Sequence, residues 1–195
     1  MATLKNNLKP SVYGIGFIGE GDYRPSINRK KTKAYSKWNN ILHRSYDVKY
    51  KENNPTYKDV IVCKYWHNFQ NFAKWFENNY KEGFELDKDI LIKGNKIYSP
   101  ETCCFVPREI NSLFKTYSKK SELPIGVTYD KFNNKYKVSF RIDKKMTTMG
   151  RFDTISKAHE IFKITKEKYI REIAEKWKGI ITEQVYEILI NYKEV

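Results

Sequence analysis

Three cysteines and one histidine are the residues of this chain that could most simply hold a metal. Cys63 and His67 lie four positions apart, and Cys103 and Cys104 could complete a set of four ligands. One spaced pair plus two adjacent cysteines is weak spacing for a zinc site, and free cysteines are often simply buried. The sequence therefore does not favour zinc. Three cysteines also make no disulfide framework, which is typical of a reducing cytosol.

Glycines near the N-terminus could in principle bind a phosphate. Gly14, Gly16 and Gly19 have the spacing of a dinucleotide-binding loop. That loop needs a strand before it and a helix after it, and residues 20–25, with a glycine and a proline, would break a helix. We expect instead a flexible loop whose glycines allow close backbone approach. No Ser/His/Asp set, HExxH pattern or P-loop pattern occurs in the sequence.

The most informative stretch lies between residues 86 and 111. It contains Leu86-Asp87-Lys88-Asp89-Ile90, Lys93-Gly94-Asn95-Lys96, Tyr98-Ser99-Pro100-Glu101-Thr102-Cys103 and Pro107-Arg108-Glu109-Ile110-Asn111. These segments resemble the HNH (His-Me finger) nuclease motif, in which a strand pair and a helix hold one divalent metal. The resemblance implies an HNH-like ββα-metal core with flanking helices.

The resemblance also implies a metal site. Asp87 matches the aspartate that ends the first strand of the motif, and Asn111 matches the last asparagine, on the helix. A carboxylate and an amide oxygen suit a hard cation, so the expected cofactor is Mg²⁺ or Mn²⁺. The metal would stabilise charge on the scissile phosphate and on the leaving oxygen. Thr102 stands where the family has its middle asparagine.

The general base of the motif is the part that differs. Lys88 occupies the position of the family's histidine, and lysine is a poor base when it is protonated. Asp89 could serve as a substitute base or as a second ligand, and His67 could be brought in from elsewhere in the fold. The candidate catalytic residues are therefore Lys88 and Asp89. An active nuclease and an inactive relative that keeps the fold both remain open.

Hydrophobic spacing predicts the elements that must position these residues. Helical patterns run from Tyr35 to Tyr46 and from His67 to Tyr80, a short strand is expected near Val60–Cys63, and two short strands within 86–97. Residues 107–114 form a further helical pattern. We assign residues 1–34 to a basic irregular arm and residues 35–117 to the HNH-like domain, with a linker at 118–124.

The charge of the chain predicts a polyanionic partner. The 195 residues carry a net charge of +14, and residues 1–60 hold half of it, with 12 basic and 5 acidic side chains. Such an excess repels itself unless a partner neutralises it. A soluble protein with well-solvated lysines is the alternative. The arm contributes the candidate DNA-binding residues Arg29, Lys30, Lys31 and Lys33.

The last third of the chain has a different sequence pattern, with strand-like segments followed by one long helical segment. Strands are expected at 125–129, 136–142 and 146–152, followed by a helix from about Ile155 to Trp177 that Asp153 or Thr154 could cap. In the middle strand, apolar residues alternate with cations. A helix can cover one face of so small a sheet, which leaves the other face open. The predicted class is thus α+β, ending in a three-stranded antiparallel sheet packed on one helix.

Residues 124–178 resemble the apetala/ethylene-response-factor DNA-binding domain. The segments that carry the resemblance are 124–131, 134–140 and 149–154, with Ala158 and Phe162 on the helix. In that family three strands carry basic and aromatic residues into the DNA major groove. The resemblance implies five DNA-facing residues: Tyr129, Lys131, Lys135, Lys137 and Arg141. Residues 179–195 form a C-terminal amphipathic helix that could pack on the chain or mediate a dimer.

The two resemblances, in this order, are similar to the free-standing HNH homing endonucleases of bacteriophages. We therefore expect a monomer in the cytoplasm of an infected bacterial host that binds double-stranded DNA and no membrane, with metal-dependent phosphodiester cleavage as its activity. The alternative is a cleavage-dead factor that binds DNA or a host protein, such as a regulator or an inhibitor of a host defence system. The sequence lacks the single-strand stacking motifs of RNA-binding modules, which disfavours that third interpretation.

Overall fold

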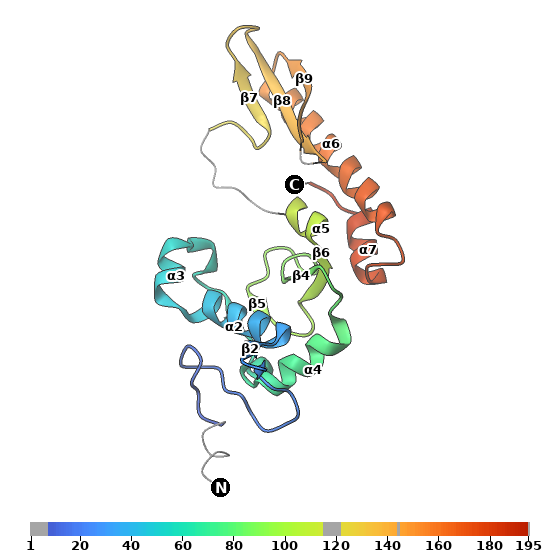
Figure 1. Cartoon of the computed structure of the whole chain (residues 1–195). Coiled ribbons are helices and arrows are strands. Elements are labelled where there is room, and N and C mark those ends of the chain that lie inside the picture. Colours follow the sequence, from blue (N-terminus) through green and yellow to red (C-terminus); the bar gives the residue numbers. More distant parts are fainter. Residues whose placement is uncertain (1–7, 115–121, 144, 195) are drawn as a thin grey trace. The chain divides into compact units, whose positions relative to one another are not determined.

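The chain, described by a computed structural model over residues 8–114, 122–143 and 145–194, is a mixed α+β protein (Figure 1). It divides into two compact units, Met1–Asn111 and Ser112–Val195. The division falls a few residues before the predicted linker at 118–124, of which residues 118–121 lie outside the described residues. The α+β class predicted from the sequence is confirmed.

Two helices carry the core of the first unit. Helix α2 (Lys33–Tyr46) begins where the Thr32 side chain accepts a hydrogen bond from Tyr35 N, and α4 (Phe69–Asn79) begins where Asn68 caps Gln70 N. Both caps satisfy backbone donors that the first helical turn leaves free. The two predicted helices are confirmed. Shorter helices lie between them: α3 (Val48–Asn53) and the 3-10 turns Pro55–Tyr57 and Lys64–His67.

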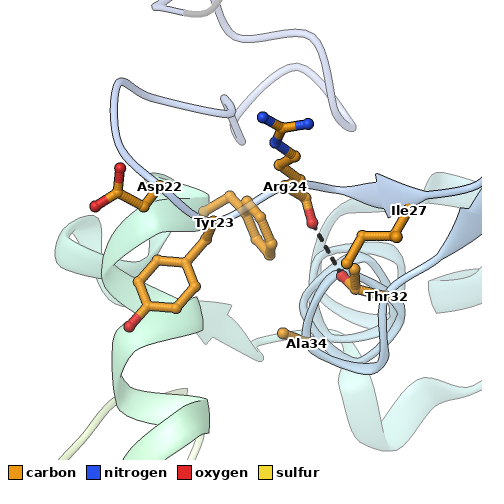
Figure 2. A pocket seen from close by; sticks show the side chains of 7 residues that line it. Asp22, Tyr23, Arg24, Ile27, Thr32 and Ala34 are labelled. Carbon is orange, nitrogen blue, oxygen red and sulfur yellow. Dashed lines mark hydrogen bonds between the residues drawn. The ribbon is translucent and has the colours of Figure 1, made fainter.

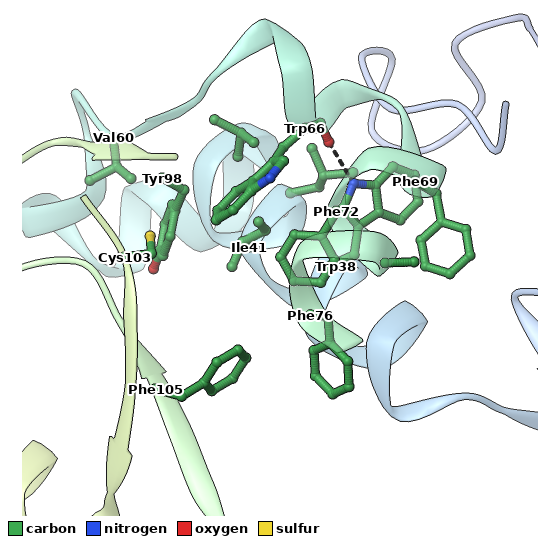
Figure 3. Packing of buried hydrophobic residues seen from close by; sticks show 13 residues of the cluster. Trp38, Ile41, Val60, Trp66, Phe69, Phe72, Phe76, Tyr98, Cys103 and Phe105 are labelled. Carbon is green, nitrogen blue, oxygen red and sulfur yellow. Dashed lines mark hydrogen bonds between the residues drawn. The ribbon is translucent and has the colours of Figure 1, made fainter. Parts of the chain in front are cut away.

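Aromatic side chains fill the core of this unit (Figure 3). Trp38 of α2 and Phe72 of α4 are fully buried, and Trp38 Nε1 donates a hydrogen bond of 2.6 Å to Trp66 O. Phe105 packs against Phe76, with ring centroids 5.5 Å apart. Because a buried indole N–H needs an acceptor, the Trp38 bond fixes α2 against the 3-10 turn at 64–67.

Four strands of the first unit pair across long stretches of sequence. Strand β4 (Phe84–Asp87) pairs antiparallel with β6 (Cys104–Pro107), and α5 (Arg108–Leu113) follows directly. Strand β5 (Ile97–Tyr98) pairs in parallel with β3 (Ile61–Val62). The expectation of two short strands around a turn within 86–97 is therefore wrong. The polar loop between β4 and β5 prevents that pairing because its backbone groups bond to side chains of its own.

The N-terminal segment is largely irregular where the structure describes it, and it also contains a short hairpin. Residues 26–31 form a hairpin of β1 (Ser26–Ile27) and β2 (Lys30–Lys31), and Phe17 N donates to His67 O at 2.9 Å. Gly16 lies so close to α2 that an added Cβ would be 2.4 Å from Leu42 Cδ1. Close backbone approach, which the glycine pattern predicted, thus holds the described part of this segment on the core.

The second unit is a sheet covered on one face by a helix. Strands β7 (Val127–Asp130), β8 (Lys135–Ile142) and β9 (Lys145–Phe152) form an antiparallel sheet in that order. Helix α6 (Ile155–Lys176) lies against it, with Ala158 and Phe162 packed on Val127 and Val138. The three strands and the helix predicted from the sequence are confirmed. The cap is Thr154, whose side chain accepts from Lys157 N.

The last helix packs on the chain itself. Helix α7 (Glu183–Ile190) contacts α6, and its Val185 and Leu189 are fully buried. The Tyr186 hydroxyl donates a 2.6 Å hydrogen bond to Glu175 of α6. The apolar face of α7 is thus used within the unit. Among the described residues, every helix is too short or too polar to cross a bilayer.

Candidate nucleic-acid interface

The face of the sheet that α6 leaves open is predominantly basic. Register places Thr128 and Arg151 beside Lys137, and Asp130 beside Lys135. A register shift after Val138 turns Met149 toward the core, so Thr148 pairs with Ser139. Residues opposite one another point to the same side of a sheet. The open face thus comprises Thr128, Asp130, Lys135, Lys137, Ser139, Arg141, Met146, Thr148 and Arg151, with four cations and one carboxylate.

Two of these four cations are paired and two are not. Arg151 Nε lies 2.7 Å from an Asp130 carboxylate oxygen, and Lys135 Nζ lies 3.1 Å from Asp153. Lys137 and Arg141 make no ion pair with any residue that the structure describes. Because both lie on one face, each two residues from Ser139, their fields add toward solvent.

The Asp130 carboxylate organises this face. Hydrogen bonds from Arg151 and from Asn133 lower the pKa of Asp130 to about 2. It therefore stays ionised at neutral pH and holds the Arg151 guanidinium by a charge-assisted hydrogen bond. Arg151 was not among the predicted DNA-facing residues. The alternation of β9 could have found it, had the register with Lys137 been known.

Two of the five residues predicted to face DNA lie outside this face. Tyr129 pairs with Tyr136, and their rings are 5.3 Å apart. Tyr136 packs against the core under α6, so Tyr129 belongs to the helix side of the sheet and not with the cations. The structure therefore does not bring the predicted DNA-facing set together on one face. Lys131 is exposed in the turn between β7 and β8. Lys135, Lys137 and Arg141 share the open face, as the alternation predicted.

The basic residues near the N-terminus surround a tight hairpin turn. Asn28 and Arg29 both have positive φ, 49° and 63°, which gives the type I′ turn that matches the twist of a hairpin. Arg29 and Lys30 are exposed there. Lys33 is bonded to Glu82, and Lys31 Nζ lies 5.8 Å from the Tyr35 ring centroid. Arg29 and Lys30 are thus more available to a polyanion than Lys31 and Lys33, which have partners within the chain.

A hollow of about 460 Å³ lies beside this hairpin (Figure 2). The Thr32 hydroxyl donates to Arg24 O across its wall, at 3.2 Å. Its lining contains one carboxylate, Asp22, and two hydroxyls that are already bonded: Thr32 caps α2, and the Tyr23 hydroxyl donates to Glu77. These groups do not form a catalytic set. The lining residues are Asp22, Tyr23, Arg24, Ile27, Thr32, Ala34 and Phe69, none of which is a predicted site residue.

The region that resembles the HNH motif folds as a strand pair followed by a helix. Asp87 ends β4, as the resemblance implies, and its Oδ1 accepts hydrogen bonds from Asp89 N at 2.7 Å and Ile90 N at 2.8 Å. Burial raises the pKa of Asp87 above its ordinary value, although these two N–H groups oppose the shift. The carboxylate thus fixes the turn that follows β4.

Lys88 is almost fully enclosed, with 7% of its surface exposed. Its Nζ donates to both Asp89 carboxylate oxygens, at 2.7 and 2.8 Å, and to Asn95 O at 2.9 Å. An ammonium group has three N–H donors and no lone pair. All three donors are used, so Lys88 in this arrangement can neither take a proton nor reach a phosphate. Asp89 is its counter-ion, and both of its carboxylate oxygens accept hydrogen bonds from Lys88.

Asn95 and Thr102 hold the rest of the loop. Asn95 Nδ2 donates to Lys88 O at 2.8 Å and to Ile97 O at 2.7 Å, and its Oδ1 accepts from Ile97 N at 3.1 Å. Thr102 Oγ1 donates to the same Ile97 O at 2.6 Å and accepts from Ser99 N. The sequence identified Asn95 only as a turn residue. Its bonds make it a structural part of the loop.

Asn111 and Asp87 are not joined. Asn111 Nδ2 donates a 2.6 Å hydrogen bond to Glu85, which Arg108 also approaches at 3.8 Å. Glu85 precedes Asp87 by two residues on the same face of β4, a spacing of about 6.6 Å. His67 is bound elsewhere, with Nε2 3.0 Å from Val62 O. Neither the asparagine nor the histidine is therefore held at the Asp87 carboxylate.

The three cysteines are buried or half-buried free thiols. Burial raises the pKa of Cys103 to about 12 and also raises the pKa of Cys104 and Cys63. Metals bind the thiolate, so these shifts oppose ligation. Within residues 8–114, 122–143 and 145–194, no three His, Cys, Asp or Glu side chains converge as a metal site.

Comparison of the chain with family models, with curated proteins and with solved structures gave no match.

Proposed function

We propose that this protein binds duplex DNA through the open face of the β7–β8–β9 sheet and does not cleave it. The observation that carries the proposal is the pair Lys137 and Arg141, two cations of β8 without ion partners among the described residues, on a face that the helix leaves uncovered. A β-ribbon can enter the major groove, and cations on it would contact phosphates. The net charge of +14 supports a polyanionic partner.

We further propose that both units derive from the proteins they resemble. Strands β4 and β6 with α5 would be a degenerate HNH core, and β7–β9 with α6 an apetala-type domain. In such a core, Mg²⁺ would sit between Asp87 and Asn111. The side chains present do not favour that site, because Asn111 bonds to Glu85 and Asp87 accepts two backbone N–H groups. The position of the general base is filled by Lys88, whose donors are all used.

The binding half of the proposal is tested with a 30-base-pair duplex and fluorescence anisotropy. Raising salt from 50 to 200 mM should weaken binding by about ten- to a hundredfold, as expected for two to four phosphate contacts. The double reversal Lys137→Glu/Arg141→Glu should weaken binding at least tenfold more than Lys157→Glu/Lys168→Glu. The control pair lies on the exposed surface of α6 and changes net charge equally. Equal losses in the two variants would contradict the proposed face.

The cleavage half is tested with supercoiled plasmid in Mg²⁺ or Mn²⁺. We expect no nicking by the intact protein or by Asp87→Ala. Metal-dependent nicking that disappears in Asp87→Ala would show that the core is an active nuclease, and the proposal that it does not cleave would be wrong.

A further inference from the structure

Phe132 is the most exposed large apolar side chain among the described residues, with 96% of its surface in water. It lies in the turn between β7 and β8, the tip of the hairpin that borders the open basic face. A phenylalanine there contributes nothing to the core. Covering its ring by a partner would remove a large apolar area from water, which is favourable at about 25 cal/mol per Å².

The turn that carries Phe132 is fixed by its own hydrogen bonds. Asp130 Oδ1 accepts from Phe132 N at 3.2 Å and from Asn133 N at 3.3 Å, and Oδ2 accepts from Asn133 Nδ2 at 2.9 Å. The Tyr129 hydroxyl bonds to Asn134, whose φ is +50°. The backbone is thus ordered before any partner arrives, so binding through Phe132 costs little additional entropy.

The same carboxylate joins this turn to the cations. Asp130 lies on the open face opposite Lys135 and holds Arg151, and Lys131 precedes Phe132 directly. The charges near Phe132 are thus three cations, including Lys131, and the two carboxylates that pair with Lys135 and Arg151. This net positive set favours a polyanion over an apolar protein surface or a cationic partner. On duplex DNA the phosphates would meet the cations, and an apolar ring needs an apolar group on the bases. In the major groove that group is the thymine 5-methyl.

We propose that Phe132 contacts thymine 5-methyl groups in the major groove and gives the protein a preference for A·T-containing sites. This inference rests on the proposed function, since it takes the β7–β8–β9 sheet as the DNA-binding face. In it, Lys137 and Arg141 supply affinity for the backbone, whereas Phe132 supplies discrimination between bases.

The test compares two hairpin duplexes of alternating A·T sequence, one with thymine and one with deoxyuridine, which lacks only the 5-methyl. The intact full-length protein should bind the thymine duplex about fourfold more tightly per methyl group covered. Phe132→Ala should bind both duplexes equally. Ile164→Ala, which truncates another exposed apolar residue on α6, should keep the preference. Thermal unfolding should be unchanged in Phe132→Ala because the ring is exposed.

Each outcome is decisive. Equal binding of the two duplexes by the intact protein would overturn the methyl contact while leaving DNA binding by the sheet intact. A preference that survives in Phe132→Ala would overturn the assignment to this residue, as would equal loss of affinity on both duplexes. Failure of the intact protein to bind either duplex at low salt would overturn the proposed function together with this inference.

Discussion

The loop after β4 and the open face of the β7–β8–β9 sheet both concentrate charged side chains, but they use them differently. In the loop, Lys88 is buried and gives all three N–H donors to Asp89 and Asn95. On the sheet, Lys137 and Arg141 have no ion partner within the described chain. A charge whose partners are built into the fold stabilises that fold, whereas a charge without them is available to a ligand.

This contrast explains why the motif residues and the binding residues separate. A buried ammonium must be paired because its desolvation costs several kcal/mol, so Lys88 cannot give up its acceptors without disrupting the loop. An exposed lysine or arginine remains hydrated, so it has no desolvation cost in the unbound protein and can still bind a phosphate. In the loop after β4, which carries the more recognisable motif, the charged groups are therefore already bonded. On the sheet face, which has the simpler pattern, two cations are available to a ligand.

The largest expected effect comes from breaking the support of the open face without changing any charge. In Gly126→Ala, the new Cβ would lie 2.0 Å from Phe162 Cδ2, at a φ of +78°. Overpacking and left-handed strain together should destabilise the second unit by about 2–5 kcal/mol. Denaturant unfolding should show this loss. It is followed by the fluorescence of Trp177 in a background in which the other tryptophans are replaced. DNA affinity should fall with the stability.

Gly179→Ala is the matched control for that substitution. Its φ is +72°, but nothing lies within 4 Å of the added Cβ. Only the backbone strain of about 1–2 kcal/mol applies. If the two alanine variants lost the same stability, the close packing of Gly126 on Phe162 would not support the sheet face.

A smaller effect on stability is expected from removing the buried Lys88 side chain in the loop after β4. Lys88→Ala removes the bonds to Asp89 and Asn95 and leaves the Asn95 carbonyl without its donor. Loss of a charged hydrogen-bond partner should cost about 1–3 kcal/mol in the free energy of unfolding. Lys93→Ala, in the same loop but exposed, should change stability by less than about 0.5 kcal/mol. DNA affinity of both folded variants should stay within twofold of the intact protein. A large loss of affinity in Lys88→Ala alone would mean that this loop binds DNA.

The sequence predicted the regular elements well, because their periodicity is local. Helices α2, α4 and α6 and the three-stranded sheet follow from spacing along one segment. The pairing of β4 with β6 was not predictable in this way, since sixteen intervening residues separate the strands and no period links them. The partners of each strand depend on the loop, which Asn95 and Thr102 hold by bonds that no spacing rule describes.

The candidate site was predicted in part, for a similar reason. Alternation along β8 places Lys135, Lys137 and Arg141 on one face without further information. Placing Tyr129 and Arg151 required the register of the neighbouring strands, which puts Arg151 with the cations and Tyr129 on the helix side of the sheet. The resemblance supplied Asp87 and Lys88 as site residues, but residue type alone could not reveal that Lys88 has all its donors occupied.

The smallest expected effect concerns the one carboxylate on the open face. The pKa of Asp130 is lowered to about 2 by Arg151 and Asn133. A lowered pKa in the folded state adds stability above the ordinary aspartate value of about 3.9, and that stability is lost as pH falls toward 2. The melting temperature of Asp130→Asn should therefore lie below that of the intact protein at pH 6, and the gap should narrow between pH 4 and pH 2. Asp153→Asn, which breaks only the exposed pair with Lys135, should melt close to the intact protein. A gap that stayed constant down to pH 2 would mean that the Asp130 charge does not brace the turn, and the rigid presentation of Phe132 would lose its main support.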